Sequence, residues 1–298
     1  MKTFAGRCAV ITGAGSGFGR EFAKLAAARQ MNLVLADVQA DALEAVASSL
    51  QADGREVLAQ RCDVAEEGQV RALADAAFDR FGAVHLLFNN AGVATGGLSW
   101  EASTADWQWV LGVNLMGVVH GIQAFVPRMI AGGEEGHVIN TASVAGLLSP
   151  PLMAVYNVSK HAVVTLSETL HHDLRLQGSR LGVTVLCPAF VPTGIADSAR
   201  NRPAHLERGR EPTASEIAAR QSSDKAVSSG KISAAQVAHM TFDAIEAQQF
   251  YCVTHPKIMP SVQSRCEDLA QLRNPTDPFA HKPEVKNRME GAAPSSQA

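Results

Sequence analysis

Two kinds of segment alternate along the chain. Short apolar runs rich in β-branched and aliphatic residues are typical of buried strands. Seven such runs occur, at residues 7–12, 32–37, 56–63, 84–90, 137–143, 182–188 and 250–255. Apolar residues recur every three or four positions, as in helices with one buried face, at residues 20–30, 41–51, 69–81, 115–130 and 234–247. This alternation predicts an α/β fold: a doubly wound, parallel, seven-stranded sheet with helices on both faces.

The same pattern predicts a single domain. No stretch within residues 1–255 is long or biased enough to act as a linker, so we expect one domain over residues 1–273. Within it, residues 193–230 mix helix formers with charges and are expected to form a lid over a substrate. Residues 274–298 end in small and polar residues and are expected to form a flexible tail.

Composition and charge exclude several classes of partner. The chain has 298 residues, 46% of them hydrophobic, and a net charge of -3, so nucleic acid and anionic membranes find no basic surface. The amino terminus reaches Gly13 too early to hold the apolar core of a signal peptide, and no run of about 18 apolar residues occurs. We therefore expect a cytoplasmic protein. The five cysteines form no CxxC pair and are expected to be reduced, and we predict no metal site.

The turn after the first predicted strand carries the first chemical signal. Residues 12–19 read TGAGSGFG, and glycines at such a turn let the backbone approach a ligand and leave free N–H groups at a helix start, which suits a pyrophosphate. The spacing GxxxGxG departs from the GxGxxG fingerprint, and a turn that only joins a strand to a helix remains an alternative. The cofactor-binding positions expected here, with the Phe18 side chain packing, are Gly13, Ser16, Gly17, Phe18 and Gly19.

Asp37 ends the second predicted strand. A carboxylate at this position can accept hydrogen bonds from an adenosine ribose and would repel a 2′-phosphate. Its neighbours Ala36 and Val38 offer no compensating cation, so the position favours NAD over NADP. An aspartate that only begins a turn or caps the next helix is the alternative.

The stretch YNVSK, residues 156–160, carries the second signal. Tyr156 and Lys160 are four residues apart on a predicted helix, so their side chains share one face. An ammonium group nearby favours the phenolate and lowers the tyrosine pKa, which lets Tyr156 act as a general acid or base. Ser143, at the end of the fifth strand, can stabilise charge on a reacting oxygen. Each residue also has an ordinary alternative: core packing for Tyr156 and a turn cap for Ser143.

Taken in order, these motifs resemble those of the short-chain dehydrogenase/reductase family over about residues 5–255. TGAGSGFG resembles the family's cofactor turn, CDV (62–64) its adenine contact, NNAG (89–92) its central-strand motif, and Ser143 with YNVSK its catalytic set. The resemblance implies a Rossmann-like, dinucleotide-binding and catalytic domain. One departure is Ala189, where the family usually has glycine after the sixth strand, so nicotinamide contacts are expected to differ there.

The resemblance also implies roles for individual residues. Asn114 is expected to hold a water that links Lys160 to solvent, although it could instead satisfy backbone groups, and Lys160 is expected to bind the nicotinamide ribose. The implied catalytic residues are Asn114, Ser143, Tyr156 and Lys160. The implied cofactor contacts beyond the glycine turn and Asp37 are Asp63, Val64, Asn90, Ala91, Gly92, Tyr156, Lys160, Pro188, Val191 and Thr193.

These observations predict an NAD-dependent oxidoreductase that acts on an apolar secondary alcohol or ketone. Residues 93–100 and 144–153 are expected to line the substrate pocket and are mainly apolar. Four arginines of the predicted lid leave an acidic substrate group as an alternative to a solvated lid face: Arg200, Arg202, Arg208 and Arg210. An epimerase or dehydratase and a non-catalytic dinucleotide-binding regulator are the other functions considered. The resemblance further implies a homodimer or homotetramer that packs through helices 104–131 and 154–178.

Overall fold

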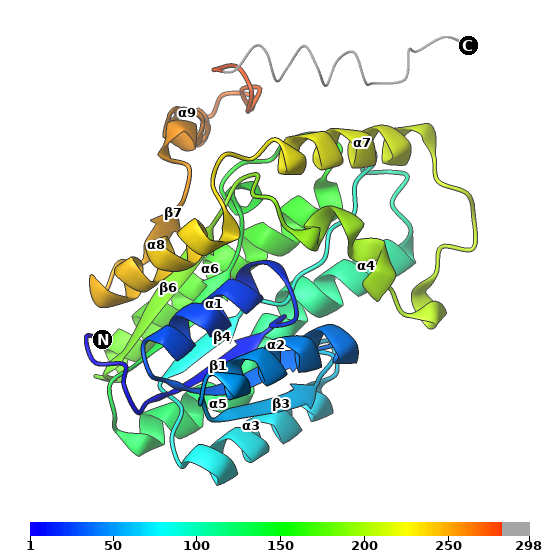
Figure 1. The fold of residues 1–298 in the computed structure, drawn as a ribbon. Helices are drawn as coiled ribbons and strands as arrows, with labels where there is room; N and C mark the ends of the chain where they lie inside the picture. Colours follow the sequence, from blue (N-terminus) through cyan, green and yellow to red (C-terminus); the bar gives the residue numbers. More distant parts are fainter. Residues whose placement is uncertain (282–298) are drawn as a thin grey trace, which may run out of the picture.

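A computed structural model describes residues 1–281, so most of the predicted tail, residues 282–298, lies outside the described residues. The described residues contain one seven-stranded sheet in the order β3-β2-β1-β4-β5-β6-β7, and every pair of neighbouring strands is parallel (Figure 1). The predicted sheet is therefore confirmed. Its strands are β1 (Cys8–Thr12), β2 (Asn32–Asp37), β3 (Val57–Arg61), β4 (Leu86–Asn89), β5 (Gly136–Thr141), β6 (Leu181–Cys187) and β7 (Tyr251–Val253).

Helices cover both faces of the sheet, as predicted. One face packs against α1 (Gly17–Ala28), α2 (Ala40–Ala52) and α8 (Ala234–Glu246). The other face packs against α3 (Glu67–Phe81), α5 (Gly117–Gly132) and α6 (Ala154–Leu176). Because side chains alternate along a strand, Ile11 of β1 enters the first core and Val10 the second. Both strand faces are buried, which explains the continuous apolar runs in the sequence.

A long helix crosses the second face and supplies one candidate site residue. It begins as α4 (Thr104–Leu111), continues through a π-helical turn (Gly112–Met116) that contains Asn114, and ends as α5. The whole stretch is long and apolar enough to cross a membrane, with a mean hydropathy of 1.5, but half of its most apolar window is buried inside the domain. A core helix meets the same test, so this finding does not favour a membrane partner.

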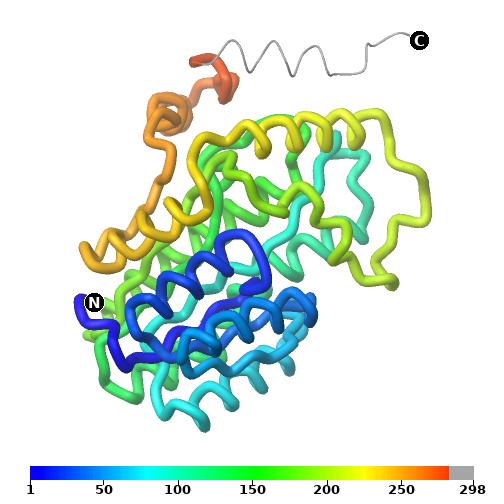
Figure 2. Tube along the Cα trace, in the orientation of Figure 1, coloured from blue at the N-terminus to red at the C-terminus, as the bar shows by residue number. Residues whose placement is uncertain are grey.

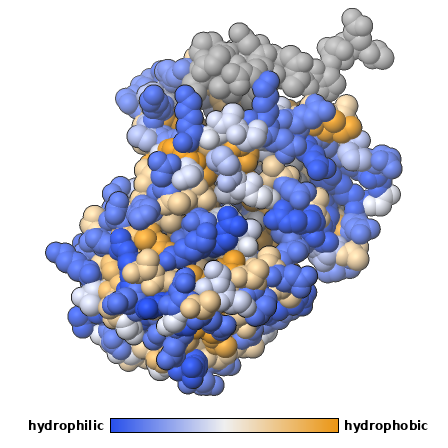
Figure 3. Space-filling model, viewed as in Figure 1, coloured by the Kyte–Doolittle hydropathy of each residue, from blue (hydrophilic) through white to orange (hydrophobic). Residues whose placement is uncertain are grey.

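The remaining elements lie beyond the carboxyl ends of the strands. We call residues 193–230 the lid segment. It contains two 3-10 helices, η3 (Gly194–Asn201) and η4 (Ala204–Leu206), followed by α7 (Ala214–Ser228), which runs across the top of the molecule in Figures 1 and 2. After β7 the chain forms α9 (Met259–Ala270), and residues 274–281 return toward it, where Thr276 donates a hydrogen bond to Asp268. On the face shown in Figure 3, hydrophilic and hydrophobic residues are interspersed.

Candidate active site

One large cavity lies at the carboxyl edge of the sheet, beneath the lid segment. Its volume is about 1840 Å³, and it is lined by the glycine turn, the residues after β4 and β5, the start of α6 and the lid segment. All of the predicted site residues line this cavity except Gly19 and Asn114. The structure therefore brings most of the predicted site residues together in one cavity, and Gly19 and Asn114 are not part of its lining.

The glycine turn needs its glycines for two physical reasons. Gly13 has a φ of +66°, a left-handed conformation that side chains disfavour. Gly19 has no room for a side chain, because a Cβ there would lie 2.1 Å from the backbone oxygen of Gly13. Helix α1 can therefore begin directly against the turn, with its first N–H groups facing the cavity.

Asp37 connects the glycine turn to the end of β2. Its carboxylate accepts hydrogen bonds from the backbone N–H groups of Gly15 and Gln39, each at 2.9 Å. Asp37 therefore has the turn role that was its alternative. Its contact with an adenosine ribose stays a prediction. The sheet also brings a cation that the sequence neighbours lack: Arg61 pairs with Asp37 in the β2–β3 register and donates to the backbone oxygen of Val38 at 3.2 Å. This arrangement corrects the inference that no cation lies near the position.

The NNAG motif joins the central strands to the glycine turn. The Asn90 amide donates to the backbone oxygen of Thr12 at 2.9 Å. The Thr12 hydroxyl accepts the N–H groups of Asn90 and Ala91, at 2.9 and 3.1 Å. These bonds fix the floor of the cavity between β1 and β4, so Asn90 positions backbone as well as lining the site.

Ser143, Tyr156 and Lys160 meet at the other side of the cavity. Ser143 follows β5, and its hydroxyl accepts the N–H of Ala145 at 3.1 Å and donates to the backbone oxygen of Pro188 at 3.3 Å. Tyr156 and Lys160 lie on one face of α6, with the Lys160 ammonium nitrogen 5.7 Å from the centre of the Tyr156 ring. The predicted juxtaposition of phenol and ammonium is therefore present.

The pKa values of this pair differ from the sequence-based expectation. Burial raises the pKa of Tyr156 to about 12, although a hydrogen bond with Ser143 acts in the opposite direction. Burial also lowers the pKa of Lys160 to about 8. Desolvation is thus the largest influence on the pKa of Tyr156, and the Lys160 ammonium donates its 2.8 Å hydrogen bond to the Thr141 backbone oxygen.

Asn114 is buried in the π-helical turn, and its side chain binds protein groups. Its amide oxygen accepts the N–H of Val93 at 2.8 Å, and its amide nitrogen donates to the Val93 oxygen at 2.9 Å and to Ser159 at 3.0 Å. The alternative in which Asn114 satisfies backbone groups is therefore observed. Its predicted role in holding a water stays a prediction.

Sequence reasoning missed several residues that shape the cavity. Gln39 donates from its amide to Asn201 at 2.6 Å, which connects the β2 end to the lid segment. Ser198 accepts the N–H of Ala94 at 3.1 Å and so fixes the lid to the residues after β4. Gly15 lies inside the TGAGSGFG motif, so its place in the cavity lining could have been predicted. Gln39, Asn201 and Ser198 carry no local signal, because their partners are distant in sequence.

Four of the five arginines of the lid segment are engaged with the protein. Arg202 and Arg208 bind the carboxylate of Asp106, Arg210 binds Glu216, and Arg200 donates to backbone oxygens of η3. These contacts do not favour the alternative of an acidic substrate group. Within the described residues no cluster of three His, Cys, Asp or Glu side chains can hold a metal ion, and all five cysteines are free.

The cavity fits a dinucleotide on its own geometry. The turn at Gly13 and Gly19 leaves backbone N–H groups at the start of a helix for phosphates, and Asp37 places a carboxylate at the edge of the same cavity. Tyr156 and Lys160 lie at its opposite side. A long, bipartite ligand can therefore extend from the end of β2 to the start of α6.

Comparisons with known proteins agree with this geometry. A family model described as short chain dehydrogenase matches residues 7–204. A short chain dehydrogenase/reductase from Burkholderia phymatum, solved in complex with NAD, is 56% identical with a TM-score of 0.92 over 94% of this chain and 100% of that chain. The CLA biosynthesis dehydrogenase/reductase of Lactiplantibacillus plantarum is 34% identical over 89% of this chain and 93% of its own length. The C alpha-dehydrogenase of a Sphingobium strain is 36% identical over 68% of this chain and 67% of its own length.

Proposed function

The chain belongs to the short chain dehydrogenase/reductase family of oxidoreductases, and from this premise we propose that it transfers a hydride between NAD and an apolar secondary alcohol or its ketone. The observation that supports this proposal is one cavity that contains the glycine turn, Asp37, Ser143, Tyr156 and Lys160. A dinucleotide bound there supplies the hydride acceptor or donor.

In this proposal Tyr156 is the general acid and base. Its phenolate takes the hydroxyl proton of the alcohol as hydride leaves the carbon during oxidation, and its phenol donates that proton to the oxygen during ketone reduction. Ser143 donates a hydrogen bond to the same oxygen and stabilises charge on it. Lys160 carries positive charge beside the phenol. With Lys160 beside it, Tyr156 has a pKa raised to about 12, so the positive charge of an oxidised nicotinamide would have to lower that pKa for catalysis near neutral pH.

NAD as the cofactor rests on two observations. The Asp37 carboxylate lies where it would repel a 2′-phosphate, and the similar Burkholderia protein was solved with NAD. Arg61, next to Asp37 in the sheet, is the feature that opposes this preference, because it offers a cation to a phosphate.

An apolar substrate is favoured by the cavity wall around Tyr156. Aliphatic side chains from the segment after β5 and from the lid segment line it: Leu148, Leu152, Met153, Leu206 and Ile217. Such side chains gain free energy by burying hydrocarbon.

The two alternative functions, a regulator and an epimerase or dehydratase, have less support. A regulator has no need of the assembled Ser143, Tyr156 and Lys160. The related epimerases and dehydratases resemble GxxGxxG at the first turn, and TGAGSGFG at residues 12–19 does not have that spacing.

The test is NADH formation by the purified protein with NAD and a panel of apolar secondary alcohols. Tyr156→Phe keeps the ring and removes the proton carrier, so turnover should fall at least about a hundredfold, the scale of general acid–base catalysis, while NAD binding by calorimetry stays unchanged. Tyr251→Phe is the matched control, because Tyr251 is the other tyrosine of the chain and its exposed hydroxyl binds Glu168. Full turnover in a folded Tyr156→Phe protein would contradict the proposed mechanism.

We also propose a homodimer or homotetramer. The helices predicted to pack against a second copy expose large apolar side chains: Met116, Ile130, Val158 and Leu176. Burying such side chains in a self-complementary interface is the usual basis of closed symmetry. Light scattering coupled to size exclusion measures the mass, and a monomer at micromolar concentration would contradict the proposal.

A further inference from the structure

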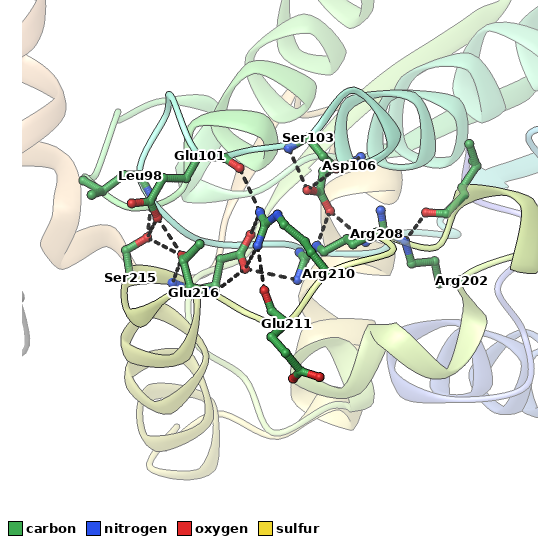
Figure 4. Close-up of polar contacts among 12 residues, drawn as sticks. Leu98, Glu101, Ser103, Asp106, Arg202, Arg208, Arg210, Glu211, Ser215 and Glu216 are labelled. Atoms are coloured by element: carbon green, nitrogen blue, oxygen red, sulfur yellow. Dashed lines mark hydrogen bonds and ion pairs between the residues drawn. The ribbon is translucent and has the colours of Figure 1, made fainter.

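Six charged residues connect the lid segment to α4 and to the residues before it. We call them the lid network: Glu101, Asp106, Arg202, Arg208, Arg210 and Glu216. Figure 4 shows Arg202 and Arg208 bound to Asp106 of α4, and Arg210 bound to Glu216 of the lid segment. The three positive and three negative charges cancel, so the network offers no excess charge to an acidic substrate. Its function must therefore be sought in what it holds in place.

Asp106 is the centre of one half of the network. Its side chain is 1% exposed, and one carboxylate oxygen accepts hydrogen bonds from Arg202 at 2.7 Å and Arg208 at 2.8 Å. The other oxygen accepts both the N–H and the hydroxyl of Ser103, which caps α4. Burial acts to raise the pKa of Asp106, but the hydrogen bonds from Arg202, Ser103 and Arg208 outweigh it and lower that pKa to about 2. The carboxylate is thus charged and fully paired.

Glu216 is the centre of the other half and is built in the same way. It caps α7 by accepting the N–H of Thr213 at 2.9 Å, and its two oxygens bind the Arg210 guanidinium at 2.8 and 3.0 Å. Arg208 lies 3.7 Å from the same carboxylate and connects the two halves. Both acids thus occupy the N3 position of a helix capping box. The acceptor capacity that remains on each carboxylate binds lid arginines.

The network holds lid side chains against the substrate wall. Arg202 donates to the backbone oxygen of Leu206 at 2.6 Å, and its guanidinium lies 5.0 Å from the Trp109 ring centre. Leu206 in turn packs on the apolar cluster formed by Val93, Trp109, Val110 and Val155, next to Tyr156. Trp109 and Leu206 both line the cavity. Displacing the network would therefore move an apolar wall without touching the reacting groups.

Helix α7 is also docked tightly on the residues after β4. A Cβ on Gly96 would lie 2.6 Å from the Ala219 side chain, and one on Gly97 would lie 2.8 Å from Glu216. Ser215 accepts the Leu98 N–H at 3.0 Å and donates to Glu101 at 2.5 Å. The lid segment is thus closed in this conformation, and charged side chains make most of its polar contacts to α4 and the residues before it.

We propose that Asp106 and Glu216 are positioning residues for substrate binding: through the lid arginines they hold the apolar wall of Trp109 and Leu206 closed over the substrate. This inference rests on the proposed function of the cavity. It predicts that the network controls affinity for the alcohol, with little effect on the proton and hydride steps at Tyr156 or on the cofactor side. It also assigns Arg202, Arg208 and Arg210 to internal pairing, not to substrate recognition.

The test compares Asp106→Asn, Glu216→Gln and the charge-retaining Asp106→Glu. Asp75→Asn is the matched control, because Asp75 binds Arg128 at 2.7 Å on an exposed surface remote from the lid. Removing a buried carboxylate leaves its arginines uncompensated. The KM for an apolar alcohol should therefore rise about tenfold in the first two variants. The value of kcat should change less than about threefold and the KM for NAD should stay unchanged, with partial recovery in Asp106→Glu and no effect in Asp75→Asn.

Hydrogen exchange of the lid segment gives a second reading that needs no activity. Amides of residues 202–216 should exchange faster in Asp106→Asn and Glu216→Gln than in the original protein or in Asp75→Asn. Unchanged exchange in both variants, or a parallel loss of kcat and NAD affinity, would overturn the inference. If Asp106→Asn fails to fold, Glu216→Gln decides. If the original protein oxidises no alcohol, the proposed function fails, and lid exchange still decides whether the network positions the lid.

Discussion

The cofactor side of the cavity, from β1 to the end of β2, is built mainly from backbone atoms, whereas the substrate side beneath the lid segment is held by charged side chains. On the first side Gly13, Gly15 and Gly19 allow segments to approach within contact distance, and Asp37 accepts two backbone N–H groups. On the second side Asp106 and Glu216 bind arginines more than 90 residues away or within their own segment.

This difference has consequences for tolerance to change. A site made by close backbone approach fails when one Cβ is added, because backbone cannot move aside cheaply. A site held by ion pairs tolerates a change of side-chain volume but depends on charge and on both partners. Substitutions should therefore act on cofactor binding through sterics and on substrate binding through electrostatics.

The largest effect is expected from Gly19→Ala. The new Cβ would lie 2.1 Å from the Gly13 oxygen and 2.8 Å from the Asn90 amide nitrogen, so the turn must move. The Kd for NAD, measured by calorimetry, should rise at least about a hundredfold. A change of that size corresponds to the upper end of the free-energy cost usually found when a side chain is forced into a packed site. Gly68→Ala on α3 is the control, since a Cβ there meets nothing within 4 Å. NAD affinity within threefold of the original would contradict the steric account.

A change of cofactor preference should be the next largest effect. The original protein should prefer NAD to NADP by about a hundredfold, because a phosphate next to the Asp37 carboxylate costs several kcal/mol. Replacing Asp37 with Ser and Val38 with Arg removes the repulsion and adds a cation, so the ratio of kcat/KM values should fall below about ten or invert.

Arg61 sharpens that experiment. Because the sheet places it beside Asp37, Arg61→Gln in the doubly changed protein should weaken NADP use if this arginine contributes to phosphate binding. If the original protein already prefers NADP, then Asp37 serves only in the turn and the ribose assignment is wrong.

The smallest effect is expected where the two sides meet, at the 2.6 Å hydrogen bond from Gln39 to Asn201. Asn201→Ala removes one neutral hydrogen bond, worth about 0.5 to 1.5 kcal/mol. If NAD lies beneath it, the rate of NAD dissociation, followed by stopped-flow fluorescence, should rise about threefold while alcohol KM stays constant. A rise in alcohol KM instead would show that the two sides are coupled through η3.

The cavity lining at the glycine turn, at the end of β2 and at the start of α6 was largely predictable from the sequence because its signals are local. The glycine turn, Asp37 at a strand end, and the four-residue spacing of Tyr156 and Lys160 each lie within one element or one turn. The alternation of apolar runs and helical periods gave the seven strands, because a strand buried on both faces must be apolar throughout. These features need no knowledge of which distant segments meet.

What the sequence by itself determined is therefore the sheet, its covering helices and the residues that line the cavity at the glycine turn and at the start of α6. Tertiary structure alone decided the placement of Arg61 beside Asp37, the contact between Gln39 and Asn201, and the pairing of Asp106 with two lid arginines. It also decided that desolvation raises the pKa of Tyr156. The physical reason is common to all four: local periodicity fixes backbone geometry, whereas desolvation and ion pairing depend on which distant side chains the fold brings within a few ångströms.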